Sequence, residues 1–281
     1  MSRLAPLALL AAGRSRDCFL SRLPGFAQRL GPVRSSSFRL ASRISNLLGA
    51  GHPVEGLEEV SQCRVILIRM PEAWLEPIVD ELVDSIADWK NKTVLLCDRR
   101  VDSSVLHKLA FLGAATGSLA PVSPGGDPVF VVEGHRRAVR EAKALVAEPG
   151  TRVIAMDRGR KALFGASVSF ATSLALPLLA ATVETMRACG IEQNDALFLA
   201  ERLMQKTIRA YLKGGRKGWE GALPMQQKEE LRSQLQALLR FNPLLASYFF
   251  ENSVLVTQIF RQDPKWLREL EPPEYAQAAG Q

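Results

Sequence analysis

The first residues whose types and spacing point to chemistry are Ala11-Ala12-Gly13-Arg14-Ser15-Arg16, which follow the strand-like run LALL at 7–10. A glycine-rich turn between a strand and a helix brings backbone N–H groups to the pyrophosphate of a dinucleotide. That turn has the pattern G-x-G-x-x-G, and only its middle glycine, Gly13, is present here. Ala11 adds a methyl group at the tight turn, and Arg16 adds a long side chain where strand and helix pack closely. Alone, the pattern is a weak indication of cofactor binding.

The same stretch also has the composition of an organelle-targeting peptide. Residues 1–50 contain eight Arg, no Lys and one acidic residue, Asp17. The remaining 231 residues hold equal numbers of basic and acidic side chains, so the net charge of +7 lies in this opening segment. Import signals are basic amphipathic helices rich in Arg and Ser. We therefore expect a mitochondrial protein, with a plastid as the alternative, and treat 1–50 as a transit peptide, a degenerate first βαβ unit, or both.

Alternating strand and helix patterns in residues 51–157 predict the elements that would position such a loop. Apolar runs of strand length cover 64–70, 93–97, 128–134 and 151–156, and amphipathic helix patterns cover 72–89, 102–113 and 135–146. Strands that are buried on both faces and separated by helices form a mostly parallel sheet. Cys63 and Cys97 accompany the apolar runs, which predicts buried thiols. The Cys and His residues show no metal-ligand spacing, so no metal is expected.

Residues 158–270 change to long helical patterns, and 271–281 form a tail without periodicity. Helices are expected over 159–190, 192–213, 225–240 and 242–262. The stretch 162–183 contains no charged residue and is long enough to cross a bilayer of about 30 Å. It also carries several hydroxyl side chains and Pro177. A helix buried in a helical domain or between two subunits is apolar on all sides too, and we prefer this explanation to a membrane span.

Six motifs follow one another in a characteristic order. They are RVILIRMPEAWLEPIVDEL (64–82), ATGSLAPV (115–122), VFVVEG (129–134), KALFGASVSFATSL (161–174), GIEQNDALFLAERLMQKTI (190–208) and EGALPMQQKEELRSQLQAL (220–238). Together they resemble a bacterial family in the superfamily of pyrroline-5-carboxylate and ketopantoate reductases. The resemblance implies an α/β Rossmann-like NADP-binding domain, followed by an all-α domain of the 6-phosphogluconate-dehydrogenase C-terminal type whose function is uncharacterised. It also favours a folded first βαβ unit over 7–37.

The resemblance implies candidate residues for the cofactor. In the superfamily, a short run of Ser, Arg or Thr after the second strand holds the extra phosphate of NADP. The candidate cofactor-binding residues are therefore Gly13 and Arg14 in the loop, with Arg34, Ser35, Ser36 and Ser37 after the expected second strand. Ser hydroxyls and Arg both donate hydrogen bonds to phosphate. The serine cluster of a transit peptide explains the same run equally well.

The polar groups that the family uses for its reaction are mostly replaced. Hydride transfer needs side chains that hold and protonate a carbonyl or imine. Ala120 stands where the family has His, Phe164-Gly165 where it has Tyr-His, and Ser173 where it has Asn. Lys161 and Ser173 remain as candidate catalytic residues. Since the loss of one preorganised donor commonly costs about 3–4 kcal/mol in the transition state, we expect a protein that kept the reductase fold and lost its chemistry.

The leading hypothesis is a mitochondrial pseudoenzyme without a cofactor, acting as a structural or interaction subunit that dimerises through its helical domain. Tyr248, Phe249, Phe250 and Trp266 are candidate anchors, although such aromatics more often belong to a core. The alternative is an NADP-dependent oxidoreductase acting on a small imine or keto acid. A second alternative is RNA binding through KTIRAYLKGGRKGW (206–219), which carries five basic residues and ends in Trp219.

Overall fold

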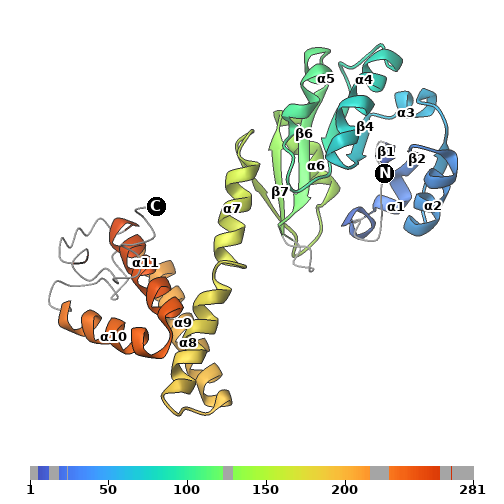
Figure 1. The fold of residues 1–281 in the computed structure, drawn as a ribbon. Coiled ribbons are helices and arrows are strands. Elements are labelled where there is room, and N and C mark those ends of the chain that lie inside the picture. Colours follow the sequence, from blue (N-terminus) through green and yellow to red (C-terminus); the bar gives the residue numbers. More distant parts are fainter. Residues whose placement is uncertain are drawn as a thin grey trace. The chain divides into compact units, whose positions relative to one another are not determined.

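A computed structural model describes residues 6–12, 19–23, 25–122, 129–215, 228–259 and 267. The chain divides into two compact units, Met1–Thr172 and Ser173–Gln281, which are drawn in Figure 1. The sequence predicts the boundary after residue 157. The later boundary arises because helix α7 (Lys161–Ala171) belongs to the first unit, where its first residue is buried.

The first unit is built on an eight-stranded sheet with the order β3-β2-β1-β4-β5-β6-β7-β8. The strands are β1 (Leu7–Ala11), β2 (Leu30–Arg34), β3 (His52–Val54), β4 (Val65–Arg69), β5 (Thr93–Leu96), β6 (Ala115–Pro121), β7 (Val129–Gly134) and β8 (Arg152–Ala155). All neighbouring pairs are parallel except β6 and β7. The sheet confirms the predicted mostly parallel Rossmann-like fold.

Strand β1 lies at the centre of this sheet, between β2 and β4. Leu7 and Leu9 belong to the hydrophobic core on one face, and Ala8 and Leu10 to the core on the other. All four side chains are fully buried, and burial of one leucine stabilises a fold by about 2 kcal/mol. The first 34 residues therefore contain the central strand β1 and its neighbour β2, and removal of a leader ending beyond residue 37 would delete both strands.

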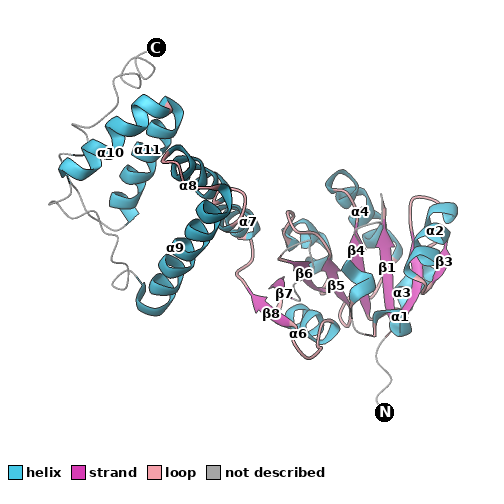
Figure 2. Cartoon of the chain, turned by 90° about the horizontal axis from the view of Figure 1, so that it is seen from below, coloured by secondary structure: helices cyan, strands magenta, loops and turns pink. Residues whose placement is uncertain are grey.

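Helices cover both faces of the sheet, and Figure 2 shows α4 and α6 on opposite sides of the strands. Helices α1 (Phe26–Arg29), α2 (Phe38–Leu48) and α6 (Arg136–Leu145) contribute Phe26, Ile44 and Ala142 to the first core. Helices α3 (Glu58–Gln62), α4 (Leu75–Ser85) and α5 (His107–Phe111) contribute Val60, Ile78 and Leu109 to the second. Cys63 and Cys97 are buried, as predicted. Short 3-10 helices η2 (Phe19–Arg22), η3 (Glu72–Trp74) and η4 (Ser103–Leu106) complete the unit.

The second unit is helical throughout its described residues, as predicted. It contains α8 (Leu176–Ala188), α9 (Gln193–Gly214), α10 (Lys228–Phe241) and α11 (Pro243–Ile259). Helix α8 packs on α9, and α10 packs on α11. Val183, Ala196 and Ala200 form the small core of the first pair, and the second pair shares a core that includes Leu231 and Phe250. Phe250 is thus a core residue, whereas Trp266 lies outside the described residues.

The prediction of one buried helix over 162–183 is wrong for the single chain. Helix α7 ends at Ala171, and α8 begins at Leu176. Pro177 lacks a backbone N–H and its ring clashes with the carbonyl four residues earlier, so it interrupts a continuous helix but is tolerated in the first turn of α8. Leu163 and Phe170 are each 65% exposed. By length and composition, Lys161–Ala188 suffices to cross a membrane, with a mean hydropathy of 1.7 and none of its most apolar window buried. Burial of this stretch between two subunits stays a prediction.

Candidate functional site

The strand order of the sheet reverses between β1 and β4, because β2 and β3 continue on one side and β5 and β6 on the other. In open α/β sheets, ligands bind at the carboxyl ends of the strands beside such a reversal. In this chain, that edge is formed by Ala12 after β1, by 70–74 after β4 and by 97–102 after β5. The backbone N–H of Ala12 donates to the Arg69 carbonyl at 3.1 Å, which joins the ends of β1 and β4.

The described part of the connection from β1 to β2 contains only short helices. Gly13 and Arg14, the predicted loop residues, lie outside the described part of the chain. The described helices of the connection, η2 and α1, have four residues each. A helix terminus attracts a phosphate because many aligned peptide dipoles add up behind it. These two one-turn helices provide few such dipoles, so they support a phosphate less well than a full-length helix would.

Arg34 and Ser35, predicted for the extra phosphate of NADP, are already engaged within the protein. The Arg34 guanidinium pairs with the Glu81 carboxylate of α4 and donates through Nε to the Glu55 carbonyl at 3.3 Å. The Ser35 hydroxyl is buried and donates to the Ala11 carbonyl at 2.5 Å. Both groups therefore use hydrogen-bond donors to join β2 to its neighbours.

The other two residues of this run, Ser36 and Ser37, are exposed. Ser37 is the N-cap of α2, where its hydroxyl oxygen accepts from the Leu40 N–H at 3.3 Å. An N-cap serine uses its oxygen as an acceptor and keeps its O–H free to donate. Of the predicted phosphate contacts in this run, Ser36 and Ser37 are thus the two whose hydroxyl groups can still donate a hydrogen bond to a ligand.

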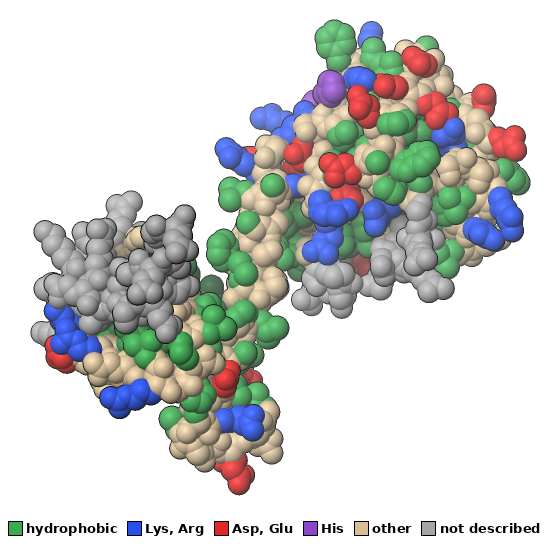
Figure 3. All heavy atoms as spheres, viewed as in Figure 1, with side chains coloured by type: hydrophobic (Ala, Val, Ile, Leu, Met, Phe, Trp, Pro, Cys, Tyr) green, Lys and Arg blue, Asp and Glu red, His purple; other side chains and the backbone are tan. Residues whose placement is uncertain are grey.

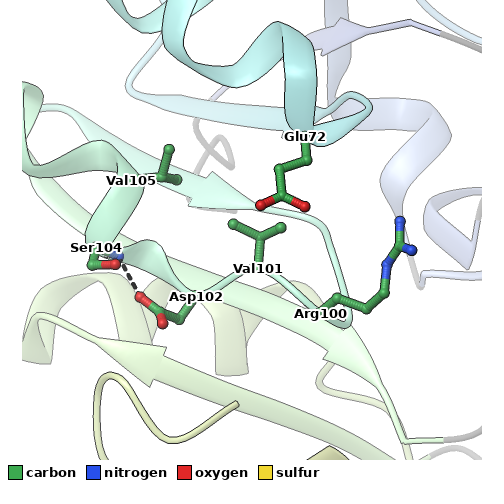
Figure 4. Close-up of a pocket in the computed structure, with 6 residues that line it drawn as sticks. All are labelled: Glu72, Arg100, Val101, Asp102, Ser104 and Val105. Carbon is green, nitrogen blue, oxygen red and sulfur yellow. Dashed lines mark hydrogen bonds between the residues drawn. The ribbon is translucent and has the colours of Figure 1, made fainter. Parts of the chain in front are cut away.

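A pocket of about 420 Å³ lies between η3 and η4, at the carboxyl ends of β4 and β5. It is lined by Glu72, Arg100, Val101, Asp102, Ser104 and Val105. Figure 4 shows the Glu72 carboxylate directed toward Val101, while Arg100 extends away from Asp102. The Asp102 carboxylate caps η4 by accepting from the Ser104 N–H at 2.8 Å. The lining offers two carboxylates and one guanidinium, but no histidine.

The Asp102 cap is electrostatically favoured. Burial raises the pKa of its carboxyl, but hydrogen bonds from Ser104 and the positive charges of Lys161 and Arg158 outweigh burial, so the pKa lies below its ordinary value of 3.8. Asp102 is therefore an anion at neutral pH. An anion that is fixed as a cap has a structural role already and is a poor proton donor.

Lys161, the predicted catalytic residue, points into the protein. It is the first residue of α7 and only 2% exposed. Its ammonium donates to the Asp98 carbonyl at 2.6 Å and to the Val101 carbonyl at 2.7 Å. Burial lowers the pKa of Lys161 below 10.5, although the nearby Glu133 and Asp98 carboxylates counteract it. The lysine thus stabilises the loop after β5 through these two hydrogen bonds.

A second buried charge, Glu133 on β7, holds the other end of this loop. Its carboxylate accepts from the Ser103 N–H and the Ser103 hydroxyl, both at 2.8 Å, and from the Ser118 hydroxyl at 2.6 Å. All three residues are at most 1% exposed. Arg158 joins the network by donating to the Ser103 carbonyl at 3.0 Å and the Thr116 hydroxyl at 3.2 Å. Glu133 therefore fastens η4 to β6 and β7.

Glu133 belongs to the motif VFVVEG and is not among the candidate site residues that the sequence predicts. The available signal was a charged residue at the end of an otherwise apolar strand, since such a residue must be paired where it is buried. Ser173 lies in the turn between α7 and α8, at the start of the second unit. Lys161 begins α7 and Ser173 follows its last residue, Ala171, so the length of this helix separates the two side chains. Among the residues described, no group of His, Cys, Asp and Glu side chains is arranged to hold a metal ion.

The first prediction concerns Lys161→Met. It leaves the Asp98 and Val101 carbonyls without a donor, which we expect to lower the free energy of unfolding by about 2 kcal/mol. Because the native pKa is lowered, the unfolded chain binds the proton more tightly between that pKa and 10.5. The wild-type stability from this group therefore rises with pH across that window, and the variant lacks the rise. Urea unfolding at several pH values measures both effects.

The matched control for this experiment is the preceding residue. Arg160→Met removes an exposed cation that makes no hydrogen bond or ion pair in the described structure, so its effect should stay within about 0.5 kcal/mol. Equal destabilisation by both variants would contradict the buried role of Lys161.

The second prediction concerns Glu133→Ala, which removes the acceptor of three buried hydrogen bonds. We expect a loss of about 3 kcal/mol or more in the free energy of unfolding, because Ser103 and Ser118 are left without their partner. Hydrogen exchange should rise selectively at η4. Glu148→Ala, at an exposed position, is the control. Unchanged exchange at η4 in the Glu133 variant would show that another contact holds the loop.

Comparison with known proteins adds a family match and a set of structural relatives. Residues 128–245 match the family model described as "Domain of unknown function (DUF2520)". None of the curated proteins matches the chain at a significant level. The match begins beside β7 and extends through the helices of the second unit up to the start of α11.

Three solved structures are similar over nearly their whole length. The V8 variant of an imine reductase from Myxococcus stipitatus, in complex with NAD+, has a TM-score of 0.65 at 16% identity and covers 95% of this chain and 99% of its own. An imine reductase from Aspergillus terreus, in complex with NADPH4, has a TM-score of 0.53 at 14% identity, and the match covers 95% of this chain and 90% of that one. A pyrroline-5-carboxylate reductase from Coxiella burnetii has a TM-score of 0.53 at 14% identity, and the match covers 95% of this chain and 99% of that one. The chain is thus a divergent protein with the Rossmann-like fold of the NADP-binding reductases and a helical C-terminal domain.

Proposed function

We propose that this protein keeps the reductase fold without the reductase reaction, and acts as a structural or interaction subunit that pairs with a second copy of itself through its helical unit. The observation that carries this proposal is the position of Lys161. Its ammonium is buried and donates to two backbone carbonyls. A proton donor for an imine or carbonyl must reach the substrate within hydrogen-bond distance, and a lysine bound in this way does not.

The residues predicted for the cofactor support the same conclusion. Arg34 and Ser35 are engaged by Glu81 and Ala11, and Ala120 is fully buried in β6. Ala120 has only a methyl side chain, so it supplies no polar group where the family uses His. Hydride transfer requires both a held nicotinamide and a polar group for the substrate, and the described residues provide neither in an evident arrangement.

The helical unit carries the apolar surface that pairing needs. Exposed large apolar side chains on α8 and α9 are Leu176, Leu178, Leu197, Phe198, Leu199, Leu203, Ile208, Tyr211 and Leu212. Monomeric proteins rarely expose contiguous apolar patches larger than a few hundred Å², and permanent dimer interfaces are large and apolar. A second copy is the partner that this surface fits, because its own α8 and α9 would offer the same apolar side chains in return.

The fold favours one alternative function, the NADP-dependent reduction of a small imine or keto acid, because two structural relatives hold NAD+ and NADPH4. In this chain, such binding would depend on Ser36, Ser37 and the loop at 11–16. The composition of residues 1–50 supports a mitochondrial location. Since β1 and β2 lie within that segment, import without removal of residues 7–34 is part of the proposal.

The third prediction is that NADPH does not bind. In a titration that follows NADPH fluorescence, we expect no saturable change up to about millimolar cofactor, beyond the usual range of working affinities. The double variant Ala11→Gly with Arg16→Gly restores two loop glycines and is the matched test of the loop. Saturable binding by the wild type, with turnover of a cyclic imine, would establish the alternative function instead.

The fourth prediction concerns pairing. Sedimentation should show a dimer, and Leu203→Glu should shift it toward monomer, because a buried charge without a partner is costly at an apolar interface. Leu203 is 53% exposed on α9, and Leu47 on α2 is 56% exposed, so Leu47→Glu is the matched control and should leave the dimer intact. A monomeric wild type, or equal dissociation by both variants, would contradict pairing through α9.

A further inference from the structure

The helices on the two faces of the sheet carry opposite charge. In α1, α2 and α6, on one face, there are seven basic residues and one acidic residue, Glu141. The basic residues are Arg29, Arg39, Arg43, Arg136, Arg137, Arg140 and Lys143. In α3, α4 and α5, on the other face, there are six acidic residues and one basic residue, Lys108. Arg29, Arg39 and Arg43 belong to the basic segment 1–50, and the four basic residues of α6 belong to the neutral remainder of the chain. The fold brings both groups to one face of the sheet.

The basic face is mostly unpaired within the described structure. Arg39, Arg43, Arg136, Arg140 and Lys143 are exposed, and none of them makes a hydrogen bond or ion pair among the residues described. The acidic helices differ, since Asp80 pairs with Lys108, and Glu81 with Arg34. Figure 3 shows the acidic side chains gathered in the upper part of the α/β unit. The positive charge of these five side chains is thus not balanced by any described residue.

Helix α6 orders part of this charge into a stripe. Arg136, Arg140 and Lys143 follow one another at four and three residues, so they lie on one face of the helix. Their repulsion destabilises α6 by a few tenths of a kcal/mol per pair, with no partner in the described structure to offset it. The stripe is about 10 Å long, which is the axial length of about three phosphates along one strand of a duplex.

We propose that the face formed by α1, α2 and α6, here called the basic face, binds the phosphate backbone of a nucleic acid. Six of its seven cations are arginines, whose planar guanidinium groups donate two parallel hydrogen bonds to a phosphate. Such contacts neutralise backbone charge and release bound counterions, which drives binding without base recognition. The proposed binding site is separate from the pocket between η3 and η4 and from the exposed apolar residues of α8 and α9.

Two other partners for the basic face fit less well. Helices that bind anionic membranes combine basic residues with apolar side chains that insert between the lipids. Helix α6, which carries the charged stripe, exposes no large apolar side chain, and on this face only α2 exposes two, Phe38 and Leu47. The acidic face of a second copy is partly neutralised by Lys108 and Arg34, which weakens its attraction. A nucleic acid offers an uninterrupted row of charges instead.

The fifth prediction tests the basic face in the full-length protein. Fluorescence anisotropy with a labelled DNA duplex, and with an RNA duplex of the same length, gives the affinity at several salt concentrations. The wild type should bind with a slope of log K against log salt of about −4, and Arg136→Glu/Arg140→Glu/Lys143→Glu should reduce the slope to about −1, with at least a tenfold loss of affinity. Circular dichroism establishes that each variant is folded, and the triple Gln variant should show a smaller loss in the same direction.

The control changes the net charge by the same amount elsewhere. Lys206→Glu/Arg209→Glu/Lys213→Glu alters three exposed cations of α9, the other basic stretch of the chain, and should bind the duplexes like the wild type. Equal losses in both triple variants, or a larger loss in the α9 variant, would overturn the proposal. So would a wild-type slope weaker than about −1, or tighter binding to phosphatidylserine vesicles than to either duplex.

Discussion

The loop after β5 rests on two buried charges, Lys161 and Glu133, and the character of the crevice follows from them. A charge removed from water is stable only when its donors or acceptors are satisfied. The carbonyls of Asp98 and Val101 satisfy Lys161, and Ser103 together with Ser118 of β6 satisfies Glu133. The same donors and acceptors are then unavailable to a ligand. The Lys161 ammonium and the Glu133 carboxylate could serve either the fold or a ligand, and in this structure their hydrogen bonds serve the fold.

Much of the α/β unit could be predicted from the sequence because its strands are continuous apolar runs, and β1 is recognisable from LALL alone. Helix α2 and strand β3 were not predicted. The Ser37 cap and Gly49, whose φ of 61° ends the helix, were present, but the serine run was interpreted as the end of a strand or a targeting signal. The short β3 contains a proline, which hides a strand. Pro177 should have divided the helix expected over 162–183.

The candidate site was less predictable, because residue type does not reveal the direction of a side chain. Lys161 was interpreted as a proton donor, and its inward position depends on where the loop carbonyls lie. Arg34 was assigned to a phosphate, whereas its partner Glu81 is 47 residues away in the sequence. The sequence alone does not predict the charge separation across the sheet, because it depends on which helices, far apart in the chain, cover the same face.

Lys161 also occupies a mechanical position. Helix α7 begins at this residue, and the boundary between the two units follows shortly after the helix ends. The ammonium group of Lys161 therefore connects the start of α7 to the carbonyls of Asp98 and Val101. Val101 also lines the pocket, so a displacement of α7 would strain the pocket wall.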